Sequence, residues 1–319
     1  MSKKLKAAAG IAGLAAATYF TVGEVFYNLF LTKGGIAFAQ KFQTKSTDGD
    51  EQTEIFNTDP SVKAGDRWYE ESEKTRLEVY TRDGAKRHAY LIKTEKPSHK
   101  YVITCHGYTS KPSDMGFYGY EFQKRGYNVV IPALDGHADS ETNKIAMGWH
   151  DRLIVVALAY RIADEDPDSQ IILHGNSMGG ATVMMATGEK MPPNVKCCIE
   201  DCGYTSVWDE YRVQLKEMFH ISKLPVLQAA DTATKLHSKF SFKEASALNQ
   251  VKKSVTPTLF IHGERDTFVP FWMLETNYSA AACEKDKLTV PDAVHGVSSL
   301  VHPELYWNKI DEFTAKYVK

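Results

Sequence analysis

The segment QIILHGNSMGGATVMMATGE, residues 170–189, carries the clearest structural signal of the chain. Its apolar beginning is typical of a buried strand, and the part after Ser177 is typical of a helix. Gly175 and Gly179 flank the serine in a G-x-S-x-G pattern. A sharp turn between a strand and a helix requires such small neighbours, because larger side chains would clash there. We therefore expect the turn to present the hydroxyl of Ser177 at a helix N-terminus, where negative charge is favoured.

Strand-like runs alternate with helix-like segments along most of the chain. A D-G pair within residues 76–94 separates two such runs and predicts a hairpin. Further apolar runs follow at residues 101–105, 128–133, 170–173, 195–200, 258–263 and 287–290. Apolar strands interleaved with helices are typical of a parallel sheet that is covered on both faces. The sequence therefore predicts an α/β fold with a mostly parallel central sheet flanked by helices.

One interval, from Cys202 to Thr256, is longer than a single helix between two strands requires. Between Trp208 and Phe219 apolar residues recur at spacings near three and four, so one face of a helix is apolar. That face either covers the sheet or belongs to a lid over a pocket at the strand ends. We interpret residues 204–255 as a helical lid within a single folded domain over residues 76–319.

The N-terminal region has the pattern of a targeting segment. Three lysines in MSKKLK precede the uncharged run AAAGIAGLAAATYFTVG, and Glu24 interrupts the apolar character that continues to Leu31. A basic stretch before an apolar one is typical of a signal peptide or an uncleaved signal-anchor. We predict a signal-anchor or export segment over residues 1–40, with residues 7–31 as a membrane tether, followed by a polar connector over residues 41–75. The catalytic domain would then lie outside the cell membrane, or the protein would be secreted. The alternative is a helix that packs on the protein or lies in the membrane interface.

The composition excludes several classes of protein. A net charge of −2 and a charged content of 24% give no reason to expect a nucleic-acid partner. The five cysteines are odd in number, and the spacing of Cys197, Cys198 and Cys202 lacks the paired C-x-x-C arrangement of a zinc site. His137 and Asp139 have no third ligand at a suitable spacing, so we interpret them as part of a turn. We expect no metal and no cofactor.

A serine hydroxyl needs a base to take its proton before it can act as a nucleophile. In a strand–turn–helix layout of this kind the partners follow in the order serine, acid, histidine. His295, in a loop after the last strand, fits the base better than His302, which begins the final helix. Asp266, beyond the strand 258–263, is our candidate acid, and its neighbour Glu264 and the more distant Asp201 are rivals.

An acyl-transfer site also needs hydrogen-bond donors for a developing oxyanion. The segment TCHGYTS, residues 104–110, follows an apolar strand and contains a glycine that permits close approach. We expect the backbone N–H groups of Tyr108 and Met178 to be the donors, each contributing about 3 kcal/mol of transition-state stabilisation. The alternative is a turn without catalytic role. We also expect Tyr108, Trp208 and Tyr211 to contact the substrate.

Four motifs together resemble the α/β-hydrolase superfamily, and in particular bacterial serine hydrolases related to serine aminopeptidases and carboxylesterases. The motifs are HGY at 106–108, GNSMGG at 175–180, HGERDTFVP at 262–270 and AVHG at 293–296. The resemblance covers about residues 76–319. It implies Ser177 as nucleophile, Asp266 as acid and His295 as base, with Tyr108 and Met178 forming the oxyanion hole. LDGHADSE, residues 134–141, departs from similar proteins, which often carry an arginine and another glycine there; this difference concerns substrate choice.

These observations predict a serine hydrolase that cleaves carboxylic esters through an acyl-enzyme intermediate. An aminopeptidase-type serine peptidase is the first alternative, and it would need an anionic group such as Glu210 to hold a substrate amine. A thioesterase or lipase, or a non-catalytic binding module on the same fold, are further alternatives. The expected partner is a small ester or a short peptide.

Overall fold

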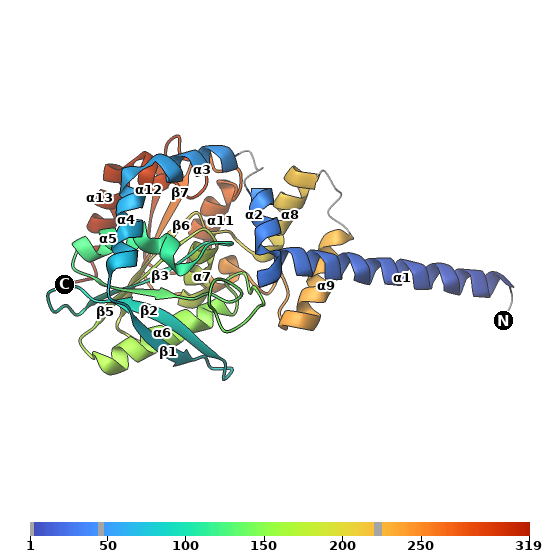
Figure 1. Cartoon of the computed structure of the whole chain (residues 1–319), viewed down its shortest axis with the longest axis horizontal. Coiled ribbons are helices and arrows are strands. Elements are labelled where there is room, and N and C mark those ends of the chain that lie inside the picture. Colours follow the sequence, from blue (N-terminus) through green and yellow to red (C-terminus); the bar gives the residue numbers. More distant parts are fainter. Residues whose placement is uncertain (1–2, 44–47, 220–224) are drawn as a thin grey trace.

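The computed structural model describes residues 3–43, 48–219 and 225–319. At its centre is an eight-stranded sheet in the order β1-β2-β4-β3-β5-β6-β7-β8 (Figure 1). β2 is antiparallel to β1 and β4, and all other neighbours are parallel. The strands are β1 (Thr75–Tyr80), β2 (Lys86–Ile92), β3 (Lys100–Cys105), β4 (Asn128–Pro132), β5 (Gln170–Asn176), β6 (Val195–Asp201), β7 (Thr258–Gly263) and β8 (Lys285–Val290). The predicted mostly parallel α/β sheet is confirmed.

The inner strands are buried on both faces, which explains their continuous apolar sequences. All of β7 is buried, and Ile171, Ile172 and Leu173 of β5 have no exposed surface. Two separate apolar cores lie on the two faces of the sheet. The first core includes α6 (Asp151–Glu165), α7 (Met178–Thr187), α10 (Ala247–Val251) and α11 (Trp272–Ala280); the second includes η2 (Pro112–Met115), α5 (Gly116–Lys124), α12 (Ser298–Val301) and α13 (Pro303–Thr314).

The region before the sheet is helical. It consists of α1 (Lys3–Phe30), η1 (Lys33–Gly35), α2 (Ile36–Gln43), α3 (Gly49–Thr58) and α4 (Pro60–Glu71). α4 packs on α5 so closely that a Cβ atom at Gly65 would lie 2.4 Å from the backbone of Phe117. The expected connector thus contains α3 and α4, and it lies against the sheet domain.

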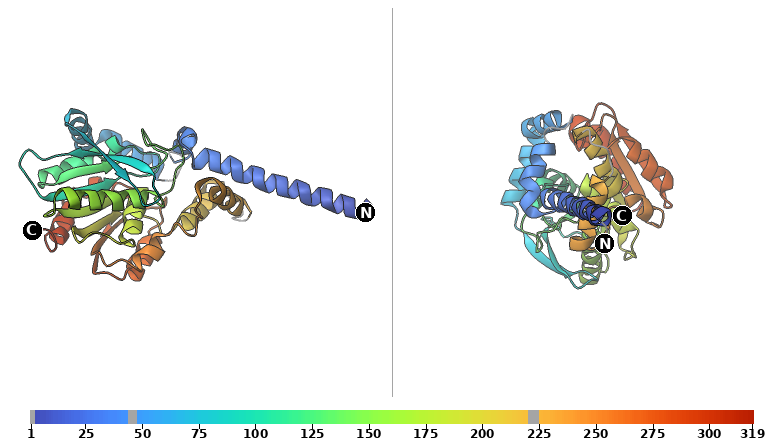
Figure 2. Two further views of the ribbon diagram at one scale, coloured as in Figure 1. Left: turned by 90° about the horizontal axis from the view of Figure 1, so that it is seen from below. Right: turned by 90° about the vertical axis from the view of Figure 1, so that its right-hand side faces the viewer.

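The first half of α1 projects away from the rest of the molecule, as Figure 1 and the left view of Figure 2 show. Its second half packs on the protein, where Phe26, Tyr27 and Leu31 are buried. Within the described ranges no helix is long and apolar enough to cross a membrane. The C-terminal part of the run predicted as a membrane tether, residues 7–31, is thus used in packing on the protein.

Two helices of the expected lid, α8 (Val207–Phe219) and α9 (Val226–Ser238), lie beside α1 at the same end of the molecule (Figures 1 and 2). The hydroxyls of Tyr27 and Ser238 are 2.7 Å apart, and His237 Nε2 lies 2.8 Å from a carboxylate oxygen of Glu24. α1 and α9 are therefore joined by both polar and apolar contacts.

Candidate active site

Ser177 occupies a sharp turn between β5 and α7. Its backbone has φ 57° and ψ −120°, an uncommon conformation for a residue with a side chain. A Cβ atom at Gly175 would lie 2.2 Å from the carbonyl oxygen of Gly179, and one at Gly179 would lie 2.0 Å from that of Cys105. Both flanking glycines are therefore required by close backbone approach, as the motif predicts.

The structure brings Ser177, His295 and Asp266 together although they are distant in sequence. The Ser177 hydroxyl lies 2.8 Å from His295 Nε2, and His295 Nδ1 lies 2.7 Å from Asp266 Oδ2. All three residues are buried, with exposed fractions of 8%, 1% and 3%. With the Nδ1 proton donated to the carboxylate, Nε2 is free to accept the serine proton. This hydrogen-bonded chain can activate a serine for attack on a carbonyl carbon.

The surroundings of Asp266 keep it ionised. Its Oδ1 accepts a hydrogen bond from the backbone N–H of Val269 at 2.8 Å, and His262 Nε2 lies 3.2 Å from its Oδ2. Burial opposes ionisation, but the charges and hydrogen bonds of His295 and His262 outweigh it and lower the pKa of Asp266. For His295, burial opposes the charged form, and the carboxylate of Asp266, with smaller contributions from Asp48 and Asp201, raises the pKa of the imidazole.

The rival residues are occupied elsewhere. The Asp201 side chain accepts a hydrogen bond from Asn176 Nδ2 at 3.3 Å, and burial raises the pKa of Asp201 to about 6. Glu264 accepts a hydrogen bond from the Thr289 hydroxyl at 2.8 Å. His302 stands at the start of α13. Among the candidate acids, Asp266 is the one hydrogen-bonded to His295.

The two expected oxyanion donors flank Ser177 in the fold. Met178 is the first residue of α7, and Tyr108 lies in the loop after β3. This loop passes next to the nucleophile, because a Cβ atom at Gly107 would lie 3.5 Å from the Cβ atom of Ser177. From these positions the backbone N–H groups can donate hydrogen bonds to an oxyanion that forms when Ser177 attacks a carbonyl.

Two buried histidines, not assigned to the site by sequence, brace the loop of Tyr108. The backbone N–H of Thr109 donates to His137 Nε2 at 3.2 Å, and that of Leu134 donates to His106 Nε2 at 3.4 Å. Burial lowers the pKa of His106 to about 4 and the pKa of His137 to about 3, so both rings are neutral and can accept at Nε2. The DGH segment, predicted to be a plain turn, is thus part of the support for the site.

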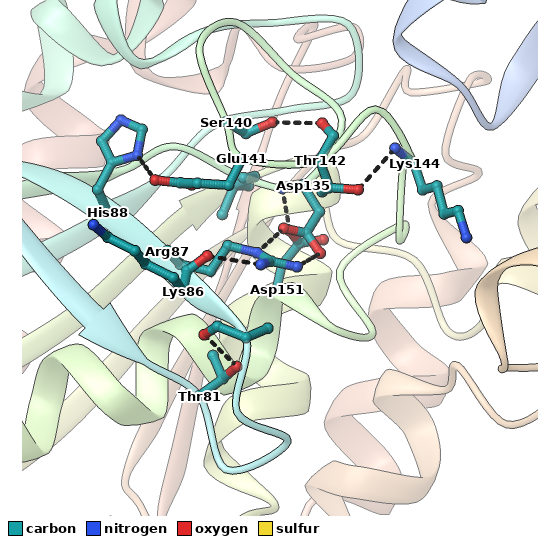
Figure 3. Close-up of polar contacts among 12 residues, drawn as sticks. Thr81, Lys86, Arg87, His88, Asp135, Ser140, Glu141, Thr142, Lys144 and Asp151 are labelled. Atoms are coloured by element: carbon teal, nitrogen blue, oxygen red, sulfur yellow. Dashed lines mark hydrogen bonds and ion pairs between the residues drawn. The ribbon is translucent and has the colours of Figure 1, made fainter.

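A polar network in turn holds the loop that carries His137 (Figure 3). Arg87 forms a two-point ion pair with Asp135, whose second contact, Nη2 to Oδ2, is 3.0 Å. The Asp151 carboxylate accepts hydrogen bonds from the backbone N–H of Asp135 at 2.6 Å and from that of Gly148 at 2.9 Å. Burial, with the nearby charge of Asp135, raises the pKa of Asp151 to about 7. The loop is therefore anchored at both ends.

An apolar pocket, partly open to solvent, adjoins Ser177. Its lining consists of Phe26, Phe30, Ala39, Tyr108, Met147, Ser177, Met178, Tyr204, Glu210, Tyr211, Gln214, Leu215, Phe268 and Val269. Tyr108 and Tyr211 thus lie where substrate contacts were predicted. Trp208 does not line this pocket, and its ring instead faces Lys243 Nζ at 4.5 Å. The contribution of α1, through Phe26 and Phe30, was missed because nothing in an apolar run indicates which surface it covers.

A wider and more polar pocket lies on another side of Ser177 and His295. α2, α3 and α4 line it together with the loop of Tyr108. Ser177 therefore lies between an apolar pocket and a wider polar one.

One group of side chains near Ser177 has ligand atoms close enough to hold a metal ion. These atoms, from Cys202, Asp266 and His295, all lie within 4.8 Å of one another. Asp266 and His295 are already hydrogen-bonded together, and burial raises the pKa of the Cys202 thiol well above its ordinary value. We therefore assign no metal to these residues.

Comparisons with known proteins agree with this architecture. The family model described as serine aminopeptidase, S33, matches residues 96–246. The uncharacterized protein YqkD of Bacillus subtilis is 23% identical over 246 residues, which cover 77% of this chain and 80% of that protein. The α/β-hydrolase domain-containing protein WAV2 of Arabidopsis thaliana is 27% identical over 202 residues, or 61% of this chain and 63% of that protein.

Solved structures show the same fold. The esterase Pf2001 of Pyrococcus furiosus superposes with a TM-score of 0.62 at 23% identity, covering 78% of this chain and 92% of the esterase. The acylaminoacyl peptidase of Pyrococcus horikoshii superposes with a TM-score of 0.55 at 16% identity, covering 76% of this chain and 42% of the peptidase. Fold and comparisons together show that the chain has the α/β-hydrolase fold and is similar to proteins of that superfamily.

Proposed function

We propose that this protein is a serine hydrolase that cleaves carboxylic esters through an acyl-enzyme intermediate. The observation that carries the proposal is the pair of hydrogen bonds, 2.8 Å and 2.7 Å long, that link Ser177 to His295 and His295 to Asp266. The apolar pocket beside Ser177 supports an acyl group as the part of the substrate that enters it.

In this mechanism Ser177 Oγ attacks the ester carbonyl carbon while His295 Nε2 takes the hydroxyl proton. The N–H groups of Tyr108 and Met178 stabilise the tetrahedral oxyanion. Collapse of the intermediate breaks the bond to the leaving oxygen, which receives the proton from His295. Water, deprotonated by the same imidazole, then attacks the acyl-enzyme and releases the carboxylic acid and free Ser177. Asp266 holds the imidazole and stabilises its charged form throughout.

An active-site fluorophosphonate tests the hydrolase part of the proposal. We expect it to label the wild-type protein and not Ser177→Ala, and a wild type that stays unlabelled would refute the proposal. p-Nitrophenyl esters of increasing chain length, assayed beside aminoacyl p-nitroanilides, test the ester preference. Turnover of the anilides alone would show that the ester assignment is wrong.

One observation favours aminopeptidase activity as the second candidate. Glu210 lines the apolar pocket beside Ser177, and its Oε2 atom is buried without a hydrogen-bond partner among the described residues. Its Oε1 accepts a hydrogen bond from Gln214 Nε2 at 2.9 Å, and burial raises the pKa of Glu210 to about 8. A substrate ammonium group would satisfy the free oxygen and favour the carboxylate form. Under this candidate Glu210→Gln loses anilide turnover and keeps turnover of simple esters; equal effects on both would contradict it.

We also propose that the projecting half of α1 attaches the protein to a membrane, with the catalytic domain outside. Ile11 and Leu14 are exposed on it, each with an exposed fraction of 71%, and basic residues precede them in the sequence. Cell fractionation combined with protease treatment of intact cells tests this. A protein found wholly in the cytosol would contradict it.

A further inference from the structure

Asp48, the residue directly before α3, is a buried acid in the predicted polar connector. Only 4% of it is exposed, and no lysine or arginine among the described residues forms an ion pair with it. Its carboxylate accepts three hydrogen bonds: from the backbone N–H of Thr267 at 2.6 Å, from the hydroxyl of Thr267 at 2.7 Å and from the backbone N–H of Phe268 at 3.0 Å. A buried carboxylate satisfied by backbone donors in this way restrains those donors strongly.

Those donors belong to the turn that carries the acid of the triad. Asp266 precedes Thr267 directly, and its own carboxylate closes the turn by accepting the N–H of Val269 at 2.8 Å. The ring of Phe268 lies on His295, with ring centroids 5.0 Å apart, and its carbonyl oxygen accepts a hydrogen bond from Gln214 Nε2 at 2.6 Å. The contacts of Asp48 therefore act on a segment that touches two of the three triad residues.

The beginning of α3 also approaches the loop of His295. A Cβ atom at Gly296 would lie 2.9 Å from Gln52 Nε2, so the helix packs closely against the residue after the base. Glu51 forms an ion pair with Arg265, 3.0 Å long, directly before the acid. α3 thus contacts the loops of both Asp266 and His295.

We infer that Asp48 is a positioning residue of the active site, which holds the turn of Asp266 and Phe268 against His295 through its hydrogen bonds to Thr267 and Phe268. The inference rests on the proposed hydrolase function. It makes the segment before β1 a part of the catalytic apparatus, so the domain at residues 76–319 is incomplete without it.

The charge of Asp48 allows its positioning role to be distinguished from a contribution to folding stability alone, because it acts on the pKa of His295. The charged and titratable groups that face His295 are Asp266 after β7, Asp201 at the end of β6, the Cys202 thiol directly after it, and Asp48 before α3; His262 of β7 contacts Asp266. Each of the three carboxylates favours the imidazolium form. Removing the charge of Asp48 should therefore lower the pKa of His295 and extend activity to lower pH.

Asp48→Asn and Asp48→Ala test the inference, with Asp50→Asn, an exposed acid in the same helical turn, as the matched control. kcat is normalised to the fraction of sites that a fluorophosphonate titrates, which removes the effect of misfolded protein. We expect Asp48→Ala to lower the normalised kcat about 10- to 100-fold with KM nearly unchanged, because small displacements of catalytic groups have effects of this size. Asp48→Asn keeps an acceptor oxygen, so its normalised kcat should fall less than that of Asp48→Ala. It should also shift the acidic limb of the kcat/KM profile to lower pH. Asp50→Asn should match the wild type in both measurements.

If Asp48→Ala does not fold, the pH profile of Asp48→Asn decides. A normalised kcat and an acidic limb equal to those of the wild type would overturn the inference. NMR titration of the His295 imidazole measures the same shift without turnover. A wild type that fails to react with fluorophosphonate or ester therefore refutes the proposed function, whereas an unshifted His295 in Asp48→Asn refutes the role of Asp48.

Discussion

Replacing Asp266 by asparagine keeps the size of the side chain and removes the charge that orients His295. In the wild type the Nδ1 proton is donated to the carboxylate across 2.7 Å. An asparagine amide can instead donate to Nδ1, and the imidazole proton then lies on Nε2. Protonated Nε2 faces Ser177 but cannot accept the serine proton. The substitution thus favours the wrong tautomer while the fold and the pocket stay intact.

The expected loss follows from this geometry. Removal of the acid in an otherwise intact triad lowers kcat by about 10⁴-fold, which corresponds to about 5.5 kcal/mol of activation free energy at about 1.4 kcal/mol for each factor of ten. Asp201→Asn is the matched control, because Asp201 is also buried at a neighbouring strand end but is hydrogen-bonded to Asn176. We expect it to change kcat by less than about tenfold, because the Asp201 side chain forms no hydrogen bond to Ser177 or His295 and contributes less than Asp266 to the charge around the imidazole.

The assay is steady-state hydrolysis of a p-nitrophenyl ester across pH, with thermal unfolding measured for each variant to verify folding. Because Asp266 is the main group that raises the pKa of His295 against burial, any residual activity of Asp266→Asn should extend to lower pH. The reasoning is refuted if Asp266→Asn keeps activity within about tenfold of the wild type, or if Asp201→Asn has the larger effect.

Three further substitutions test other parts of the account. His137→Phe removes the acceptor of the Thr109 N–H and should lower kcat about tenfold or more with fluorophosphonate labelling retained; an unchanged kcat would exclude His137 from the support of the oxyanion loop. Phe30→Ala enlarges the apolar pocket and should shift the preferred ester toward longer acyl chains, by about fourfold in kcat/KM for each added methylene at about 0.8 kcal/mol; an unaltered preference would show that the acyl chain lies elsewhere. Burial raises the pKa of Glu200 from its ordinary value of 4.5 to about 8, so the folded state retains this proton and stability falls as pH rises between those values. Glu200→Gln should reduce that fall by up to about 1.4 kcal/mol per pH unit in denaturant unfolding, and an identical slope would contradict the buried, protonated state.

The central sheet could be predicted because its strands have continuous apolar sequences. The runs at 101–105 and 258–263 coincide almost residue for residue with β3 (Lys100–Cys105) and β7 (Thr258–Gly263). Ser177 was identifiable because its glycines are required by backbone contacts within a few residues and with the neighbouring strand. Asp266 and His295 could then be selected because they follow Ser177 in the order acid, histidine and because each lies in a loop after a strand.

Other parts of the site depend on contacts that local sequence does not encode. Asp48 and Thr267 are separated by 219 positions, and a polar segment gives no sign that one of its acids binds a distant turn. The apolar run of α1 is equally suited to lipid and to a protein surface, so periodicity could not reveal that Phe26 and Phe30 line the pocket. Trp208 was predicted from its type, but its orientation depends on the packing of α8.

The most direct test of the account is pre-steady-state hydrolysis of p-nitrophenyl acetate with mass spectrometry of the quenched protein. We predict a burst of p-nitrophenol close to one equivalent per titrated site, with an added acetyl mass on the peptide that contains Ser177. Ser177→Ala should show neither the burst nor the adduct. A wild type without burst and adduct, or an adduct that persists in Ser177→Ala, would contradict the assignment of Ser177 as the nucleophile.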